Sequence, residues 1–350
     1  MSIGDWETVS RGCRRLRRRS LAVGLFAVML ASWCAAQQSA GPATPKTGAN
    51  PLAPMPEAQA ARQNAPDQDQ ASPTFRVNVK LVNIFATVVD QDGAPVGGLT
   101  KQDFTLFEDD KPQKIAVFNR ESGLPLSIVL EVDTSLSTHK DLQLELQSAR
   151  RFTHTILRPV DALALFQFSE IVDELTPFTS NLRRIDAAID HVHPGAATAM
   201  YDALYLGARA LGRRQGRKVM VVITDGGDTV STTDYAEALR SAQEAEAIVY
   251  SIIVVPIEAD AGRDIGGEHA LIQLSHDTGG KYFYASGISQ LDEAFRKISD
   301  ELRTQYQLAY YPSERLSDSD FRRIKVLVNT PAGKDWTVRA RTGYYTSKAE

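Results

Sequence analysis

Four apolar runs constrain the fold of this chain more than any other feature. They read LSIVLEVD, DALALFQFS, RKVMVVITDGG and AIVYSIIVV, and none alternates with polar residues. Strands that are buried on both faces show this unbroken pattern, which is typical of parallel sheets. Patterns with a helical period lie between the runs. The alternation predicts an α/β fold, with an open, mostly parallel, doubly wound sheet that helices cover on both sides.

A fifth run, VDELTPFT at 172–179, is expected at an edge of this sheet. It contains Pro177, which has no backbone N–H to donate to a neighbouring strand. Two further helices are predicted after the last apolar run, and the first of them ends at the pair Gly279-Gly280. The α/β block is therefore expected to cover residues 122–304.

Half-buried strands are predicted on both sides of this block, because apolar and polar residues alternate there. The stretches before it are FRVNVKLVNIFATVVD and a hairpin, FTLFEDDKPQKIAVFNRE, with its tip expected at 109–112. Those after it are YQLAYYPS, FRRIKVLVNT and WTVRARTGYY. The simplest arrangement is one small all-β sandwich, built from 75–121 and 305–347, with the α/β block inserted in it. Two independent β units flanking the block are the alternative.

The N-terminus has the pattern of an export signal. The basic stretch RGCRRLRRRS precedes LAVGLFAVMLASW, which is short of the roughly 20 residues that a membrane span needs. Cleavage is expected after Ala36, so residues 1–36 are a predicted signal peptide. The protein is then expected in the periplasm, the cell envelope or outside the cell. Without cleavage, the segment would anchor the chain in a membrane, and the sequence leaves this alternative open.

Composition and charge limit the kinds of site and partner that the protein can have. Cys13 and Cys34 both lie in the predicted signal, so the cleaved protein would have neither a disulfide nor a thiol site. Residues 37–74 are rich in Pro, Ala and Gln and are predicted to be a disordered linker. The net charge of −4 argues against a nucleic-acid partner, whose binding domain would carry a basic surface.

Oxygen-bearing side chains follow the buried runs where these end. Asp133, Ser135 and Ser137 follow the first run, Asp225 follows RKVMVVIT, and Thr198 lies in a Gly/Ala loop before a helix. Ligands of open parallel sheets bind outside the carboxyl ends of the strands. Two carboxylates and three hydroxyls suit Mg²⁺, Mn²⁺ or Ca²⁺ better than zinc. Taken alone, 133–137 also fits a simple helix cap.

These stretches resemble the von Willebrand factor type A domain, the fold also found as the inserted domain of integrins. DTSLS matches the Asp-x-Ser-x-Ser motif of that family's metal-ion-dependent adhesion site (MIDAS). GAATAMYDAL resembles the loop and helix that carry its threonine, and VVITDGGD resembles the strand end that carries its last aspartate. The resemblance covers about 122–304. It implies that the cation ligands are Asp133, Ser135, Ser137, Thr198 and Asp225.

One residue departs from the family pattern. Many members have Gly after the first Ser of the motif, where this chain has Leu136. A bulky apolar side chain is therefore expected beside the metal loop, either covering the site or meeting a partner. Over its whole length the chain is also similar to bacterial secreted proteins, notably from acidobacteria, that are described as A-domain-related.

The resemblance implies a binding function. A Mg²⁺ ion, or Mn²⁺ or Ca²⁺, would accept an Asp or Glu side chain from a protein partner. The chain is then expected to be a secreted or envelope-associated adhesion-type module and not an enzyme. One alternative is a structural envelope protein whose metal only stabilises the domain. Another is a metal-dependent hydrolase, although a haloacid-dehalogenase-type site would need a second Asp where Ser135 stands.

Overall fold

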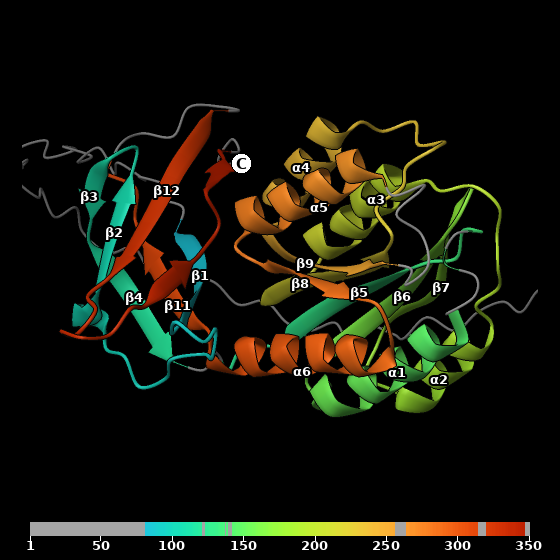
Figure 1. Ribbon diagram of the computed structural model, residues 1–350. Coiled ribbons are helices and arrows are strands. Elements are labelled where there is room, and N and C mark those ends of the chain that lie inside the picture. Colours follow the sequence, from blue (N-terminus) through green and yellow to red (C-terminus); the bar gives the residue numbers. More distant parts are fainter. Residues whose placement is uncertain are drawn as a thin grey trace, which may run out of the picture. The chain divides into compact units, whose positions relative to one another are not determined.

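A six-stranded sheet forms the centre of the α/β part (Figure 1). The computed structural model describes residues 81–120, 123–136, 138, 142–255, 264–313 and 320–346. The strand order is β10-β9-β8-β5-β6-β7, and all neighbours are parallel except the pair β6 and β7. The strands are β5 (Leu126–Asp133), β6 (Ala162–Phe168), β7 (Val172–Thr179), β8 (Arg217–Thr224), β9 (Ala247–Val254) and β10 (Lys281–Ala285).

Helices cover both faces of this sheet (Figure 1). One face packs against α1 (Leu142–Ile156), α2 (Leu182–Asp190) and α6 (Ile288–Thr304). The other packs against α3 (Met200–Gly212), α4 (Tyr235–Glu244) and α5 (Ile265–Thr278). Strand β5 is buried along its whole length and contributes Ile128 to the first core and Val129 to the second. The α/β fold predicted from the unbroken apolar runs is therefore confirmed.

Strand β10 is not among the strands predicted from the sequence. It is short, KYFYA, and its residues alternate between exposed and more buried positions. It pairs in parallel with β9 at the edge of the sheet, where Tyr282 and Tyr284 remain exposed. An edge strand needs no continuous apolar run, so it lacks the pattern that identified its neighbours.

Two four-stranded antiparallel sheets accompany the α/β part, with orders β13-β1-β11-β4 and β14-β12-β2-β3. Each combines strands from before and after the α/β block. Side chains from both sheets share one core, including Ile84, Leu106, Leu308 and Val326. The elements are β1 (Val82–Val89), a short 3₁₀ helix (Lys101–Asp103), β2 (Phe104–Glu108), β3 (Lys111–Gln113), β4 (Ile115–Arg120), β11 (Tyr306–Tyr310), β12 (Phe321–Val328), β13 (Thr337–Arg339) and β14 (Gly343–Tyr345).

The predicted hairpin divides between these two sheets. Its turn lies at Asp109 and Asp110, which both have positive φ. Strand β3 returns beside β2, but β4 pairs with β11 in the other sheet. WTVRARTGYY divides in the same way, into β13 beside β1 and β14 beside β12. Alternation reports which side of a strand is buried, and it does not report where a strand changes sheets.

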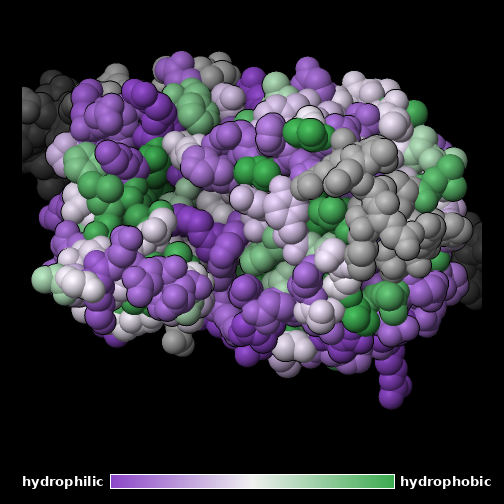
Figure 2. Space-filling view, viewed as in Figure 1, coloured by the Kyte–Doolittle hydropathy of each residue, from purple (hydrophilic) through white to green (hydrophobic). Residues whose placement is uncertain are grey.

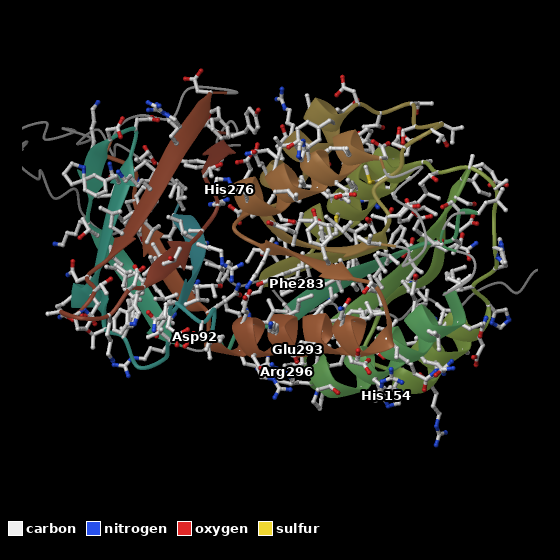
Figure 3. All side chains as sticks on the ribbon, in the orientation of Figure 1. Asp92, His154, His276, Phe283, Glu293 and Arg296 are labelled. Carbon is white, nitrogen blue, oxygen red and sulfur yellow. The ribbon has the colours of Figure 1, made fainter. Side chains whose placement is uncertain are left out.

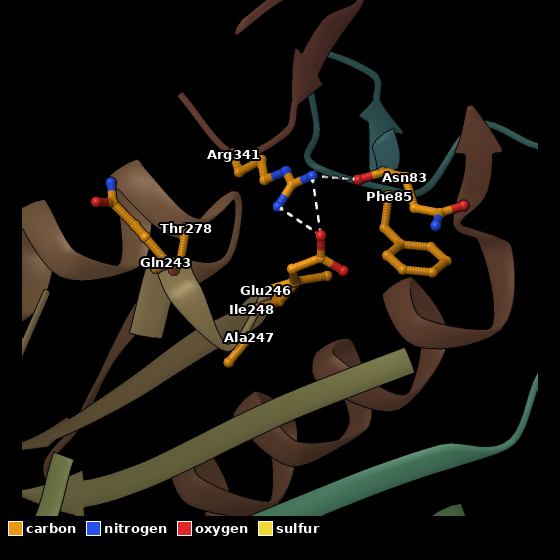
Figure 4. A pocket seen from close by; sticks show the side chains of 8 residues that line it. All are labelled: Asn83, Phe85, Gln243, Glu246, Ala247, Ile248, Thr278 and Arg341. Carbon is orange, nitrogen blue, oxygen red and sulfur yellow. Dashed lines mark hydrogen bonds and ion pairs between the residues drawn. The ribbon is translucent and has the colours of Figure 1, made fainter. Parts of the chain in front are cut away.

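Two arginines join the β sheets to the amino ends of β9 and β10. Arg339 Nη2 lies 2.6 Å from Glu301 Oε1 on α6, and Arg339 Nη1 donates to the Gly280 carbonyl at 2.8 Å. Arg341 pairs with Glu246 at 3.4 Å and donates to the Asn83 carbonyl. Figure 4 shows Arg341, Glu246 and Asn83 around a small pocket.

The outer faces of the helices are polar. On α6, Arg296 pairs with Glu293 at 2.7 Å, and His154 of α1 lies 3.0 Å from Asp186 of α2 (Figure 3). The face seen in Figure 2 is mostly hydrophilic, with hydrophobic residues in separate groups. The predicted signal peptide and linker lie outside the described residues. Within the described part, no helix combines the length and hydrophobicity that crossing a membrane requires.

Candidate metal centre

The carboxyl ends of β5 and β8 bring two of the predicted site loops together. Val132 of β5 is in parallel register with Ile223 of β8, so Asp133 lies level with Thr224. Strand β6, which follows β5 in the chain, lies on one side of β5 in the sheet. Strand β8, which comes later, lies on the other side of β5. This reversal is a topological switch point, where loops diverge and leave room for a ligand.

Asp133 is the last residue of β5 and is fully buried. Its Oδ2 accepts a hydrogen bond from Thr224 Oγ1 at 2.6 Å, and its Oδ1 accepts one from the Ser135 amide at 2.9 Å. Burial raises the pKa of Asp133 to about 6 against these hydrogen bonds, and the nearby charge of Asp225 adds to the increase. The two hydrogen bonds thus hold the Asp133 side chain in one orientation. None of these partners is a basic group that would compensate the charge of the buried carboxylate.

Asp225 follows β8 directly and is half-buried. Its Oδ1 accepts from the Gly227 amide at 3.1 Å, and Thr224 Oγ1 accepts from the Gly226 amide at 3.1 Å. Gly226 has a φ of 92°, a conformation that favours glycine. The Asp-Gly-Gly sequence therefore turns the chain sharply at the strand end and keeps Asp225 near Asp133.

The loop with Thr198 is attached to both of the other loops. Thr198 is 5% exposed, its amide donates to Thr229 Oγ1 at 2.9 Å, and its carbonyl accepts from the Thr229 amide at 2.8 Å. The Gly195 amide donates to the Thr134 carbonyl at 2.7 Å. A Cβ on Gly195 would lie 2.2 Å from Ser169 Cβ, so only glycine fits there. Three predicted ligands from distant parts of the chain thus stand on interconnected loops.

The two predicted serine ligands differ in what the structure describes. Ser135 is 2% exposed and lies two residues after Asp133, in the loop that follows β5. Ser137 lies outside the described residues. Leu136, between them, has 65% of its surface exposed to solvent. Its side chain is therefore not part of the core.

Supporting groups surround this set. Asp228 Oδ1 accepts from the amides of Met200 and Tyr201 at the start of α3, at 2.8 and 3.3 Å. Asp202 accepts from the amides of Thr232 and Thr233. Asp228 therefore caps the amino end of α3, and Asp202 holds the loop at 232–233.

Thr224 was missed by sequence reasoning. The signal that would have found it is a hydroxyl at the end of the strand beside β5. That signal becomes readable only when the pairing of β5 with β8 and its register are known.

The donor set fits a hard divalent cation. Among the described residues, no group of three or more His, Cys, Asp and Glu side chains is arranged to hold a metal. The predicted set contains only two carboxylates, and its other members are hydroxyls. Oxygen ligands of this kind are those of Mg²⁺, Mn²⁺ or Ca²⁺. A cation beside Asp133 and Asp225 would offset the burial and repulsion that raise the pKa of Asp133.

A comparison with protein-family models agrees with this fold. A family model described as von Willebrand factor type A domain matches residues 128–228. Among curated proteins, none matches the chain.

Similar solved structures share less than a fifth of their residues with this chain. An aerotolerance-related membrane protein from Bacteroides fragilis with multiple mutations to serine is 19% identical, over 51% of this chain and 98% of that one, with a TM-score of 0.41. A von Willebrand factor type A structure from Catenulispora acidiphila is 11% identical, over 77% and 75%, with a TM-score of 0.46. The pilus adhesin SpaC from Lactobacillus rhamnosus GG is 9% identical, over 72% and 49%, with a TM-score of 0.44.

The matched segment begins in β5 and ends in the loop after β8, so it includes Asp133, Thr198 and Asp225. Over residues 128–228 the chain is therefore similar to the von Willebrand factor type A domain family.

Proposed function

We propose that this protein is an exported, adhesion-type binding module whose bound divalent cation accepts an acidic side chain from a protein partner. Mg²⁺ is the favoured ion, with Mn²⁺ and Ca²⁺ as substitutes. Asp133, Ser135, Ser137, Thr198 and Asp225 would hold the cation. The predicted signal peptide supports a location in the envelope or outside the cell, and the family match supports a binding role.

The observation that carries the proposal is the state of Asp133. This carboxylate is buried at a strand end, is oriented by Thr224 and the Ser135 amide, and stands near a second carboxylate, Asp225. Burying a carboxylate without a positive partner is costly. An ordinary core would place an apolar residue or an ion pair at this position, whereas a cation makes the arrangement favourable.

The loops at this edge have one sign of charge. Their described residues, 134–136, 169–171, 193–199 and 225–234, include acidic side chains and neither Lys nor Arg. Such an edge attracts cations and repels anions. A partner carboxylate could therefore approach favourably only after a cation has reversed the local sign of charge. A cation that keeps hydroxyl ligands and an open position provides this reversal without any bond-breaking step.

Calorimetric titration with Mg²⁺ and Mn²⁺ tests the cation site. The wild-type protein should bind one ion, and Asp133→Asn should weaken binding at least about tenfold, because it removes a charged oxygen at nearly constant shape. Asp300→Asn is the matched control, since Asp300 is an exposed carboxylate on α6 that pairs with Arg296. A wild-type protein that binds neither ion, or equal binding by Asp133→Asn, would refute the site.

The partner is tested by capture from the native cell envelope in Mg²⁺ and in EDTA. A protein retained by wild type in Mg²⁺, released by EDTA and absent with Asp133→Asn would support the proposal. Cation binding without any such protein would instead favour the structural role.

A further inference from the structure

Four exposed aliphatic side chains lie on or beside the loops of the candidate metal centre. We call Leu136, Ile171, Val230 and Ile265 the apolar ring. Their exposed fractions are 65%, 59%, 44% and 63%. The described residues contain twelve exposed large hydrophobic side chains, and a third of them therefore lie in this one group of loops.

Chain continuity and backbone hydrogen bonds attach three of the ring residues to the site loops. Leu136 directly follows Ser135, and the Val230 amide donates to the Thr198 carbonyl at 3.1 Å. The Ile171 carbonyl accepts from Ser169, whose own carbonyl accepts from the Ala199 amide beside Thr198.

The fourth member is attached through α5. Ile265 begins this helix, and a Cβ on Gly267 would lie 1.5 Å from the Gly226 carbonyl beside Asp225. The first turn of α5 therefore lies directly against the Asp225 loop. All four ring residues thus lie on segments that form the candidate metal centre or contact its loops.

Isolated exposed aliphatic residues are ordinary on protein surfaces. Several exposed aliphatic residues close to one polar site need an explanation. Apolar surface beside polar residues commonly marks a site of contact with another protein. The charge of the same loops restricts the partner further. Their described residues carry carboxylates and neither Lys nor Arg, so among these residues a bound cation would supply the positive charge that an anion needs.

These two properties together select one kind of ligand. A phosphate or a free carboxylic acid could reach the cation, but it would leave the four aliphatic side chains in water. A polysaccharide would cover them with hydroxyl groups. A polypeptide with an acidic side chain between apolar ones satisfies the cation and buries the ring at once.

We infer that the apolar ring makes this site specific for protein segments in which the cation-bound Asp or Glu is flanked by aliphatic or aromatic side chains. The inference rests on the proposed function, since it assumes that the cation accepts an acidic side chain. It adds that affinity and selectivity come from apolar contacts around the ion.

Selection from a library of random twelve-residue peptides displayed on phage tests this inference. The full chain is immobilised in Mg²⁺, and bound phage are eluted with EDTA. The enriched peptides should contain an Asp or Glu with Leu, Ile, Val or Phe within two positions, well above the frequency in the starting library. Enriched acidic peptides with polar flanks would overturn the inference while leaving the proposed cation-dependent binding intact.

Variants separate the ring from the metal. Leu136→Ser combined with Ile265→Ser should keep the Mg²⁺ affinity measured by calorimetry and lose about tenfold or more in affinity for the enriched peptides, as expected when apolar contact area is removed. Leu327→Ser combined with Val160→Ser is the matched control, because Leu327 and Val160 are exposed outside the ring. Unchanged peptide affinity in the ring variant would overturn the inference. No EDTA-eluted enrichment, together with no Mg²⁺ binding, would refute the proposed function itself.

Discussion

At the residue scale, Asp133 depends on a side chain that is 91 positions away in the sequence. Thr224 Oγ1 donates to Asp133 Oδ2 at 2.6 Å, and both groups are buried. A hydroxyl that holds a carboxylate in this way fixes the direction of its oxygens. Groups that orient metal ligands typically affect metal affinity as well as stability.

Thr224→Val should reveal both effects, because valine keeps the shape and removes the donor. We expect unfolding free energy to fall by about 1–3 kcal/mol, since a buried carboxylate oxygen loses its partner. Mg²⁺ affinity should fall about tenfold. Urea denaturation and calorimetry measure the two quantities. Thr155→Val, which removes an exposed hydroxyl bonded to the Arg151 carbonyl, should change neither by a measurable amount.

Glu131 is a second buried acid on β5, with neither carboxyl oxygen hydrogen-bonded among the described residues. Burial raises the pKa of Glu131 to about 8. The protonated side chain is therefore the form that the core accepts near neutral pH. Because the folded pKa lies above the unfolded one, the folded state binds more protons between pH 4.5 and 8. The contribution of Glu131 to the unfolding free energy is then fully present below about pH 4.5 and is lost as the pH rises through 8.

Glu131→Gln should remove this pH dependence. In EDTA, the unfolding free energy of wild type relative to Glu131→Gln should fall by on the order of 3 kcal/mol between pH 4.5 and pH 8.5. Urea denaturation at several pH values measures the difference, which also cancels the titration of other groups. Glu244→Gln, at an exposed position paired with Arg240, is the control. A parallel pH dependence in wild type and Glu131→Gln would contradict the expectation.

At the element scale, α3 approaches the sheet closely because it carries Gly207. A Cβ at this position would lie 2.0 Å from Glu131 Oε1 and 3.1 Å from Val129 Cγ1. Glycine is normally unfavourable inside a helix. Here it allows the helix that follows Thr198 to lie directly on β5, and the position of the Thr198 loop depends on that packing.

Gly207→Ala should therefore destabilise the protein, although alanine favours helices. We expect a loss of about 1–3 kcal/mol from overpacking, measured by urea denaturation. Glu131→Ala in the same chain should recover part of the loss, because it removes the atom that the new methyl group meets. Gly212→Ala in the same helix meets only Ala245 Cβ at 3.8 Å and should be neutral or slightly stabilising. Equal effects at both glycines would rule out the packing explanation.

At the scale of the whole molecule, the β sheets contact the α/β part through buried charges. Glu301 on α6 is 1% exposed and has Arg339 of β13 as its ion-pair partner at 2.6 Å. Arg341, two residues after Arg339, forms an ion pair with Glu246, which directly precedes β9. These contacts lie at the amino ends of β9 and β10, at the opposite end of the strands from the candidate metal centre. The carboxyl ends of the strands, where the candidate metal centre lies, take no part in these contacts.

Arg339→Met should be strongly destabilising, because it leaves Glu301 buried without its cation. A loss of about 3–5 kcal/mol is expected in urea denaturation. Glu301→Leu added to Arg339→Met should recover most of it, since the buried charge is then gone. Arg323→Met breaks an exposed pair with Asp110 at 3.6 Å and should cost less than about 1 kcal/mol. A small effect of Arg339→Met would mean that water already solvates Glu301.

The sequence by itself determined the fold class and the position of the strand ends. Unbroken apolar runs and helical periods are local patterns. Each indicates the burial of its own segment and does not depend on which segments pack against it. Asp133, Thr198 and Asp225 could thus be assigned to loops beside the sheet. Their assignment as ligands, together with Ser135 and Ser137, remains a prediction.

Only the tertiary structure decided which distant residues meet. It placed Thr224 beside Asp133 and divided the predicted hairpin between two sheets. It also added β10 at the sheet edge and placed the segments with Leu136, Ile171, Val230 and Ile265 beside one another. Strand pairing and register depend on the combined packing of segments that lie far apart in sequence, and no local pattern records that packing.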